Sequence, residues 1–432
     1  MSYAAVRQLK VSRTLANGER VVVGGLAQNR QGVFFQYDER YLTRFGPLSP
    51  YGLQWDTSVQ LAPRQPHGGL HGVFADSLPD GWGLLLMDRV FRQRGVLPAQ
   101  VTAMDRLAFV GANGSGALSY APVADLAPTP DTTLVDLSAL GVRAQEVFDG
   151  HTTDVLAALV AAGSSGGARP KAQLYFSHAN YRSCRTYPMP GDEPWLVKFT
   201  SANLPLGHEE GLCEAAYLTL AERAGLQPPR WQLLTAPAAS GALGWLAVER
   251  FDRIWRADDV PGCMHMHSAC GLLDADFRAP SLDYQELIKV SGQLCRSVKA
   301  AQLQFLRAVF NLFAMNQDDH SKNWAFLQSD NGDWQPAPFY DITFSPGRFG
   351  EHSTAYAGFG KTPPLKVMQT LAAESGFASW QQAKHQIERV LEALADFSDV
   401  AREQGVTQDT VGLIQQQLDL TYQQNKALLS GP

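Results

Sequence analysis

Long apolar runs are missing from this sequence of 432 residues. A helix needs about 20 mainly apolar residues to cross a bilayer, and no segment approaches that length. The amino-terminal residues MSYAAVRQLKVSRTLANGER also lack the apolar centre and the small-residue cleavage pattern of a secretory signal peptide. We therefore expect a protein that does not insert into a membrane and that stays in the cytoplasm.

Cysteine is scarce as well, with five residues and no CxxC pair. An odd number of cysteines in a long chain predicts reduced thiols in ordinary buried positions, because disulfide frameworks are typical of short secreted chains. The segment CMHMHSAC, from Cys263 to Cys270, also contains His265 and His267, but its spacing matches no zinc pattern. We expect a loop that runs into a helix there, and metal binding is the alternative.

An excess of positive charge is absent too, since the formal net charge is −6. Broad electrostatic binding of nucleic acid needs many Lys and Arg side chains that face the phosphates. We therefore expect any contact with DNA to be indirect, through a partner protein.

The chain is longer than the roughly 250 to 300 residues at which single cores stop growing, so it predicts two or three domains. Short β-type runs with turns between them fill the first hundred residues. Two helices are expected within 72–94, where Pro79-Asp80-Gly81 interrupts the helical spacing of apolar residues. Two prolines make 126–133 the best linker candidate.

After this linker the pattern passes from strands to helices. Helical spacing is found at 142–162, 209–224, 284–315 and 364–428, and strand patterns at 171–176, 194–200 and 243–251. The prediction is an α+β fold with domains at 1–126, 127–254 and 255–432.

The strongest local signal is the segment NQDDHSKN, which holds Asp318 and Asn323, followed by FYDI with Asp341. Phosphoryl transfer needs a carboxylate that orients or deprotonates the attacking hydroxyl, and oxygen ligands that hold Mg²⁺ against the nucleotide phosphates. Protein kinases place an Asn five residues after the catalytic Asp and a metal-binding Asp beyond a short hairpin. The alternative is that Asp318 and Asn323 cap a helix and a turn.

A kinase also needs a strand lysine for the α/β-phosphates and an acidic partner that holds this lysine in place. Lys198, in the apolar run WLVKF, fits the first role, and Glu214 on the following helix is the candidate for the second. The alternative places Lys198 on the solvent face of an edge strand.

The segment GSSGGARPK, from Gly163 to Lys171, can turn backbone N–H groups toward phosphate oxygens, although it matches neither GxxxxGK[ST] nor GxGxxG and a surface turn is the alternative. The segment VERFDR ends the last strand before the helical half, where a kinase hinge would meet adenine.

Five segments, taken in their order along the chain, resemble the HipA family of bacterial serine/threonine kinase toxins: GSSGGARPKA, LVKF, VERFDR, DDHSKN and FYDI. The resemblance covers nearly the whole chain, since YLTRFGPLSPYGL, FADSLPDGWG and LAFVGANGSGAL look like the accessory subdomain of that family. It implies a two-lobed kinase-like fold, similar to the phosphoinositide kinases, with an added amino-terminal β-rich subdomain and a mainly helical carboxy-terminal lobe.

The same resemblance implies ATP and Mg²⁺ as cofactors, Asp318 and Lys198 as catalytic residues, and Asn323 and Asp341 as metal ligands. The residues that it places around the nucleotide are Gly166, Gly167, Ala168, Arg169, Lys171, Lys198, Glu249, Arg250, Phe251, His320, Lys322, Asn323 and Asp341. Ser164 falls where the family carries a self-phosphorylated serine, and Ser165 is an adjacent competitor.

The implied partners are a HipB-like helix-turn-helix antitoxin, which would provide the contact with DNA, and a protein substrate of the translation machinery, of the aminoacyl-tRNA synthetase class. Two other functions stay open: a catalytically weak co-repressor that acts with a DNA-binding partner, and a kinase of the same fold that acts on a small molecule.

Overall fold

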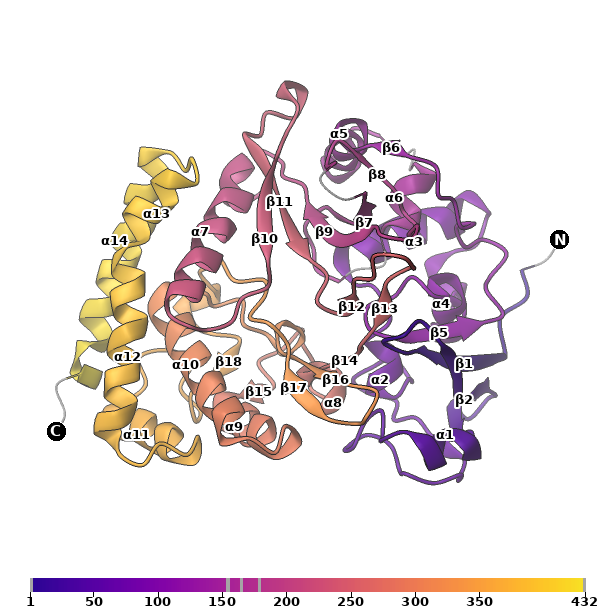
Figure 1. Cartoon of the computed structure of the whole chain (residues 1–432), viewed down its shortest axis with the longest axis horizontal. Helices are drawn as coiled ribbons and strands as arrows, with labels where there is room; N and C mark the ends of the chain where they lie inside the picture. The colour runs from indigo at the N-terminus through magenta and orange to yellow at the C-terminus, as the bar shows by residue number, and fades with distance from the viewer. Residues whose placement is uncertain (1–2, 153–155, 164–165, 178–179, 430–432) are drawn as a thin grey trace. The chain divides into compact units, whose positions relative to one another are not determined.

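The computed structural model of the chain describes residues 3–152, 156–163, 166–177 and 180–429 (Figure 1). These residues form two compact units, which are described separately. The first unit consists of Met1–Leu204, Leu234–Asp274 and Leu327–Asp333, and the second of Pro205–Leu233, Ala275–Phe326 and Trp334–Pro432.

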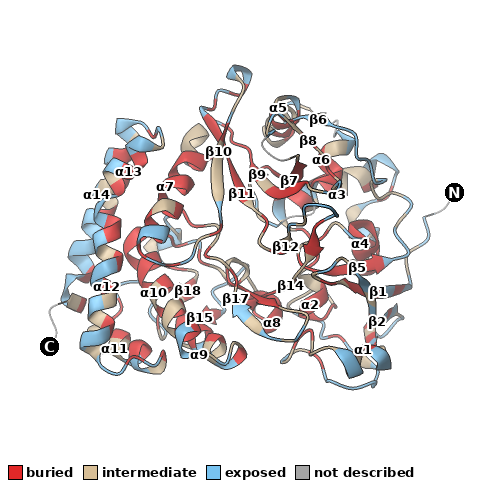
Figure 2. Cartoon of the chain, viewed as in Figure 1, coloured by how far each residue is buried: buried red, intermediate tan, exposed pale blue. Residues whose placement is uncertain are grey.

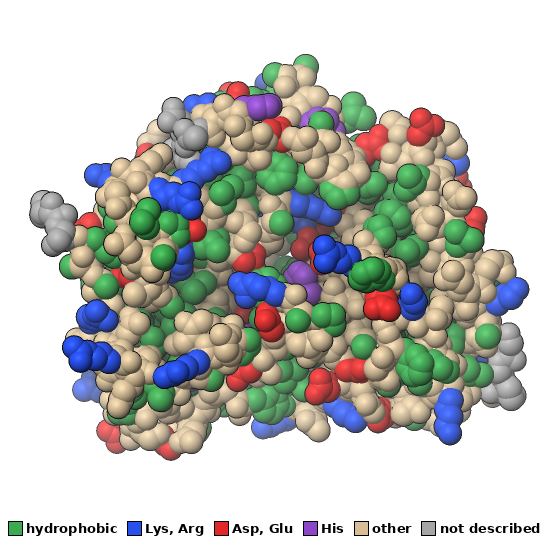
Figure 3. Space-filling model, turned by 180° about the vertical axis from the view of Figure 1, so that it is seen from behind, with side chains coloured by type: hydrophobic (Ala, Val, Ile, Leu, Met, Phe, Trp, Pro, Cys, Tyr) green, Lys and Arg blue, Asp and Glu red, His purple; other side chains and the backbone are tan. Residues whose placement is uncertain are grey.

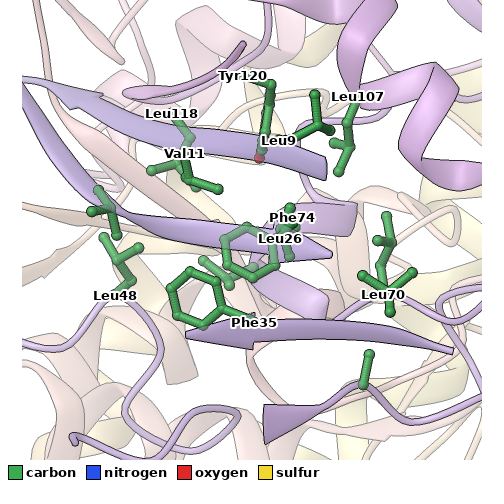
Figure 4. Close-up of a cluster of buried hydrophobic side chains, with 14 of the residues drawn as sticks. Leu9, Val11, Leu26, Phe35, Leu48, Leu70, Phe74, Leu107, Leu118 and Tyr120 are labelled. Atoms are coloured by element: carbon green, nitrogen blue, oxygen red, sulfur yellow. The ribbon is translucent and has the colours of Figure 1, made fainter. Parts of the chain in front are cut away.

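An antiparallel five-stranded sheet begins the first unit. Its strands are β1 (Gln8–Thr14), β2 (Arg20–Gln28), β3 (Val33–Tyr37), β4 (Gln60–Leu61) and β5 (Leu118–Ala121), in the order β4-β3-β2-β1-β5. Valine-rich and aromatic segments such as RVVV and VFFQY favour extended backbone. Side chains from one face, among them Val11 and Phe35, pack against Phe74 and Leu107 from the helices and form one apolar core (Figure 4).

The helices of this part are α1 (Glu39–Arg44), α2 (Gly72–Ala75), α3 (Gly81–Gln93) and α4 (Ala103–Val110). The interruption at Pro79-Asp80-Gly81 therefore separates two helices, as the sequence predicts. The linker candidate 126–133 contains no helix or strand.

A second sheet has the strand order β10-β11-β9-β7, and its strands β7, β9 and β11 belong to the first unit. Its strands are β7 (Lys171–Phe176), β9 (Glu193–Lys198), β10 (Trp231–Thr235) and β11 (Gly244–Glu249). One face is apolar, because Leu174, Val197 and Trp245 belong to a core that also includes residues of α5 (Leu137–Phe148) and α6 (Ala157–Ala161). Alternation along the strands puts Lys171 and Lys198 on the opposite face.

Shorter elements complete the first unit. They are β6 (Val135–Asp136), β8 (Ser183–Cys184), β12 (Arg253–Ile254), β13 (Gly262–Cys263), β14 (His265–Ser268) and α8 (Ala269–Leu272). For the segment 263–270 the sequence predicts a loop before a helix. The structure instead has strands β13 and β14 up to the start of α8, because the histidines alternate with methionines and therefore point to one side of an extended backbone.

The second unit is mainly helical. Its helices are α7 (Glu210–Arg223), α9 (Tyr284–Leu294), α10 (Val298–Ala314), α11 (Leu365–Glu374), α12 (Trp380–Ala395), α13 (Phe397–Glu403) and α14 (Gln408–Asn425). Figure 2 shows α7 and α10 buried along most of their length, whereas α12 and α14 are striped with buried and exposed residues. The first two helices therefore form the centre of the bundle, and the last two cover it.

Short strands lie near these helices in the chain. Strands β15 (Leu282–Asp283) and β18 (Thr354–Ala355) pair in parallel. Strands β16 (Ala325–Gln328) and β17 (Trp334–Pro336) lie between Asn323 and Asp341 in the chain, where the sequence predicts a short hairpin.

Surface properties agree with the composition. On the face drawn in Figure 3, Lys and Arg side chains are interspersed with Asp and Glu. None of the helices in the described ranges combines the length and the apolar character that crossing a bilayer requires. The five cysteines are free thiols, and three of them, Cys184, Cys213 and Cys270, are buried.

Two helical glycines make a matched test of this packing. A Cβ atom on Gly141 of α5 would lie 2.2 Å from the buried Trp245 ring, whereas a Cβ on Gly412 of α14 would meet no atom within 4 Å. Gly412→Ala should stabilise by about 0.5 to 1 kcal/mol, because Ala loses less backbone entropy in a helix. Gly141→Ala should destabilise by about 1 to 3 kcal/mol through overpacking. Thermal unfolding midpoints that moved in the same direction for both variants would contradict this packing.

Candidate functional site

The segment 316–323, called here the Asp318 loop, begins where α10 ends. Met315 adopts a left-handed conformation (φ 53°), and its backbone N–H donates to the carbonyl of Asn311 one turn earlier. This residue stops the helix, because the left-handed conformation turns the chain away from the helix axis. The Asn316 amide then donates to Asn311 Oδ1 at 2.8 Å, which fixes the start of the loop against α10.

Asp319 anchors the Asp318 loop from inside the second unit. Its side chain is fully buried, and its carboxylate accepts hydrogen bonds from Tyr284 Oη at 2.5 Å and from the Thr354 backbone N–H at 3.1 Å. His352 Nδ1 lies 2.9 Å from the same carboxylate. Asn311 Nδ2 donates to Tyr284 Oη at 2.9 Å. Burial, reinforced by the neighbouring Asp319 charge, raises the pKa of Tyr284 well above its ordinary value, so this phenol stays a donor.

Asp318 points the other way, with 67 % of its side chain exposed. Asn323 Nδ2 donates to the backbone carbonyl of Asp318 at 2.7 Å, so the amide that follows five residues later closes the loop on itself. His320 Nε2 lies 3.9 Å from Asp318 Oδ1. Asp318 is thus an accessible carboxylate on a loop that Asp319 holds in place.

Lys322 and His320 share one aromatic neighbour. Lys322 Nζ lies 4.3 Å from the centre of the Phe277 ring, and the rings of His320 and Phe277 are 5.8 Å apart. A cation over an aromatic face is attracted by the ring quadrupole, so Phe277 helps to orient Lys322.

The segment 339–345, which carries Asp341, is hydrogen-bonded to the Asp318 loop. Tyr340 Oη donates to the carbonyl of Lys322 at 2.6 Å, and the Asp318 N–H donates to Ser345 Oγ at 3.2 Å. Asp341 itself is half-buried and has a positive φ of 54°, a conformation that Asp tolerates better than most residues. The structure therefore brings Asp318, Asn323 and Asp341 onto two joined segments.

Except for Glu214, the other predicted residues lie in the first unit, and the two lysines among them are neighbours. Lys171 of β7 and Lys198 of β9 are directly opposite in the antiparallel register, and their exposed fractions are only 5% and 7%. Strand β9 lies between β7 and β11, so Lys198 is not on an edge strand and does not face solvent. The alternative of a surface lysine is therefore wrong.

The Gly-rich loop, residues 163–170, precedes β7. Gly167 has a φ of +92°, a conformation that favours glycine, and a Cβ built there would lie 2.4 Å from Lys171 Nζ. Ala168 is exposed and Arg169 half-buried. The loop backbone therefore passes directly beside the Lys171 ammonium group. Ser164 and Ser165 lie outside the described residues.

Of the hinge candidates, Glu249 is the last residue of β11, and Arg250 and Phe251 follow this strand. Arg250 is buried, and its guanidinium donates to Asp252 Oδ2 at 2.7 Å and to Gln173 Oε1 at 2.7 Å. Arg253 Nη1 donates to the same Asp252 carboxylate at 2.6 Å. These contacts occupy the Arg250 side chain. Its predicted contact with a nucleotide would therefore be made by its backbone.

Asp252 joins this strand end to the amino-terminal part of the chain. Its carboxylate accepts the N–H of Gly116 at 2.7 Å. Burial alone would raise the pKa of this carboxyl group, but the guanidinium groups of Arg250 and Arg253 hold it at about 2. Asp252 is therefore a buried charge balanced by two others.

The histidines of the segment 263–270 are bonded within the first unit. His265 Nε2 lies 2.8 Å from the carbonyl of Leu48. His267 lies between Asp76 Oδ2, at 2.6 Å from Nδ1, and Ser49 Oγ, at 2.9 Å from Nε2. These three side chains have the residue types of a catalytic Ser-His-Asp triad. Ser49 is only 1% exposed, however, so its hydroxyl is not accessible to a substrate. Among the residues that the structure describes, no group of three or more His, Cys, Asp or Glu side chains is arranged to hold a metal ion.

Glu214, the predicted partner of Lys198, is buried on α7 in the second unit, whereas Lys198 belongs to the first. Their pairing, and the assembly of the two groups of residues into one site, stay predictions. Four residues with structural roles at these segments are not among those predicted from the sequence: Asp319, Tyr284, His352 and Asp252. Only Asp319 left a signal, as a second acidic residue in a segment bordered by the apolar α10.

Two domain families match the chain. The HipA N-terminal domain matches residues 16–121, and the HipA-like C-terminal domain matches residues 163–398, which is more than half of the chain.

Two relatives extend this result. A curated protein of Sinorhizobium fredii, "Putative kinase Y4mE", is 28% identical over 383 residues, which cover 82% of this chain and 84% of that protein. The HipA of Shewanella oneidensis MR-1, solved with HipB and its operator DNA, is 17% identical with a TM-score of 0.70, and the match covers 98% of this chain and 100% of that one. This structural likeness confirms the predicted α+β, kinase-like fold.

Asp252 gives a test of stability with a defined pH dependence. Asp252→Asn leaves two buried guanidinium groups without their counter-charge and should cost about 3 to 5 kcal/mol. The folded-state pKa is depressed, so the wild-type advantage is fully present above about pH 4 and is lost as the pH falls toward about 2. Urea unfolding of both proteins from pH 7 to 2 should show the gap closing. Asp258→Asn, in the exposed segment nearby, is the control and should change stability by less than about 0.5 kcal/mol.

The neighbours Asp318 and Asp319 form a second pair. Asp319→Ala removes the acceptor of buried donors and should cost about 1 to 3 kcal/mol for each donor left unsatisfied. Asp318→Ala changes an exposed side chain and should leave the free energy of unfolding nearly unchanged. Hydrogen exchange in 316–323 should accelerate only in Asp319→Ala. Equal exchange in both variants would contradict the anchoring role of Asp319.

Proposed function

Because the chain belongs to the HipA family, we propose that it is an ATP- and Mg²⁺-dependent serine/threonine protein kinase, the toxin of a type II toxin–antitoxin system. The observation that carries this proposal is the pair of joined segments with Asp318, Asn323 and Asp341. One accessible carboxylate, one amide and a second carboxylate on segments that hydrogen-bond to each other match the requirements of phosphoryl transfer.

The donor set fits a magnesium ion. Mg²⁺ prefers oxygen ligands and is commonly held by one or two carboxylates together with substrate phosphates and water, rather than by a complete cage of side chains. Asn323 Oδ1 and the Asp341 carboxylate would hold it. When bound, the ion neutralises charge that develops on the transferred phosphoryl group.

Asp318 is the proposed general base. Its exposed carboxylate would accept a hydrogen bond from the acceptor hydroxyl and take the proton as that oxygen bonds to the γ-phosphorus. The bond between this phosphorus and the β,γ-bridging oxygen breaks, and ADP leaves. Asp319 keeps the loop from moving during the reaction, since a misplaced base loses rate steeply.

The two strand lysines support nucleotide binding in the first unit. Like charges directly opposite on neighbouring strands repel each other, and burial adds to the cost of both ammonium groups. An anion beside them lowers this cost. We therefore assign Lys198 to the α/β-phosphates, with Glu214 as its partner, and Lys171 with the Gly-rich loop to the neighbouring phosphate oxygens.

The remaining nucleotide contacts are proposed at Glu249, Arg250 and Phe251 for adenine and at His320 and Lys322 near the phosphates. Ser164 is the proposed site of autophosphorylation, with Ser165 as the competitor. A phosphate there adds roughly −1.5 to −2 charges beside the position of the ATP phosphates, which would expel the loop and inactivate the enzyme.

The proposed partners follow from the family. A HipB-like helix-turn-helix antitoxin would bind the chain and supply the contact with DNA, as HipB accompanies HipA and operator DNA in the Shewanella complex. The proposed substrate is a Ser or Thr of a translation protein of the aminoacyl-tRNA synthetase class, in the cytoplasm. The proposed domains are 1–126, an accessory subdomain, 127–254, the amino-terminal lobe, and 255–432, the helical lobe.

Labelled ATP tests the proposal. The purified chain is incubated with Mg²⁺, γ-labelled ATP and a bacterial lysate, beside Asp318→Asn and the control Asp258→Asn. We expect a labelled protein band with wild type and the control, and a loss of at least about 100-fold in Asp318→Asn, because general-base catalysis typically contributes a factor of 10² to 10⁴.

The other outcomes separate the alternatives. Labelled metabolite without labelled protein would favour a small-molecule kinase, and absence of transfer by wild type would favour a co-repressor. Phosphopeptide mapping of the same incubation should find phosphate at Ser164 or Ser165, and modification of neither serine would refute regulation through the Gly-rich loop.

A further inference from the structure

Asp80 begins helix α3 but does not cap it. The residue occupies the N-cap position, where Asp normally accepts a hydrogen bond from a backbone N–H of the first turn, yet its side chain makes no such bond. Its carboxylate instead accepts the backbone N–H of Gly167, in the Gly-rich loop 87 residues later. The side chain thus gives up a local contact for a distant one.

The Gly-rich loop returns the contact. The carbonyl of Gly167 accepts the N–H of Trp82, one of the donors that the start of α3 leaves without a partner inside the helix, at 2.9 Å. The Trp82 indole Nε1 donates to the carbonyl of Lys171 at 2.9 Å, and Trp82 is only 1% exposed. Three hydrogen bonds from Asp80 and Trp82 therefore hold the loop and the first residue of β7.

Gly81 makes this close approach possible. It has a φ of +43°, and a Cβ atom there would lie 2.5 Å from the carbonyl oxygen and 2.8 Å from the Cα of residues in the Gly-rich loop, Gly167 and Ala168. Any larger residue at this position would push the two backbones apart. The sequence PDGW thus combines an acceptor, a close backbone contact and a buried indole.

The contact lies next to the charged group of the proposed phosphate site. A Cβ atom built on Gly167 would lie 2.4 Å from Lys171 Nζ, so the backbone of Gly167 is close to this ammonium group. A shift of Gly167 would therefore move the loop amides relative to the Lys171 ammonium group. Both are proposed ligands of the nucleotide phosphates.

We propose that Asp80, with Gly81 and Trp82, is a positioning residue that presents the Gly-rich loop to the nucleotide, so that the amino-terminal part of the chain controls affinity for ATP. The proposal rests on the proposed kinase function. Asp80 acts through Gly167 and contacts no reacting atom, so its loss should weaken nucleotide binding more than it slows the chemical step.

Four variants test the proposal. Asp80→Ala removes the acceptor, Asp80→Asn keeps an uncharged one, and Gly81→Ala forces the backbones apart. Asp88→Ala is the matched control, because Asp88 lies on the same helix and pairs with Arg106 at 2.7 Å. Each variant is assayed for KM and kcat with ATP and for hydrogen exchange of the peptide 160–171 without nucleotide.

Loss of a charge-assisted hydrogen bond that holds the loop should raise KM for ATP roughly tenfold in Asp80→Ala. We expect Gly81→Ala to behave likewise, Asp80→Asn to recover part of the loss, and kcat to change less than about twofold. Exchange in 160–171 should accelerate in the same order, and Asp88→Ala should match wild type in both measurements.

An unchanged KM, a fall in kcat alone, or equal effects in Asp88→Ala would overturn the proposal. Should Asp80→Ala fail to fold, the KM for ATP of Asp80→Asn and its exchange rates in 160–171 still test the proposal. If wild type transfers no phosphate, the kinase assignment fails. In that case affinity for an ATP analogue is measured instead. If Asp80→Ala accelerates exchange in 160–171 but leaves this affinity unchanged, Asp80 does not control nucleotide binding.

Discussion

The buried carboxylate of Asp319 is the interaction on which the candidate active site depends. A carboxylate without water is costly unless hydrogen bonds replace its hydration, and here a phenol, a histidine and a backbone N–H do so. These donors come from α9, β18 and the segment before β18, so the Asp318 loop can take only the path that satisfies them. Asp318, one residue earlier, is consequently directed outward. The same backbone that buries one acid thus exposes the other.

In the first unit, too, charged side chains hydrogen-bond to groups that are distant in the sequence, at three places. Arg13 of β1 donates to the carbonyl of Ser329 at 3.0 Å, Asp252 accepts the N–H of Gly116, and Asp80 accepts the N–H of Gly167. In each case a charged side chain bonds to backbone that is far away in the sequence. Such contacts fix the course of loops that have no regular structure, because a loop cannot satisfy its own backbone groups. The start of α3 is therefore connected to the Gly-rich loop, and the segment before β5 to the strand end at VERFDR, by hydrogen bonds and not only by apolar packing.

Much of the fold could be predicted from the sequence. The strands at 171–176, 194–200 and 243–251 and the helix at 209–224 agree with β7, β9, β11 and α7 to within about two residues at most ends. Their apolar patterns are strong, and tertiary contacts only reinforce them. The single helix expected at 142–162 is replaced by two, α5 (Leu137–Phe148) and α6 (Ala157–Ala161). The first of them starts early because Asp136 accepts the N–H of Ser138 and caps it there. For the candidate site, the spacing within DDHSKN and FYDI pointed to residues that the structure places on joined segments.

The amino-acid sequence by itself determined which chemistry is available: acids and an amide at kinase spacing, two lysines in apolar strands, and a glycine-rich turn. Residue types and their distances along the chain are sufficient for that. Only the tertiary structure decided that Asp319 is buried while Asp318 is exposed, that Arg250 is committed to Asp252, and that Asp80 contacts Gly167 instead of capping α3. These choices follow from which hydrogen-bond partners, in side chains and in the backbone, lie within reach after folding. Apart from Arg250 and Asp252, these partners are separated by tens of residues, and contacts over such distances leave no periodic pattern in a single sequence.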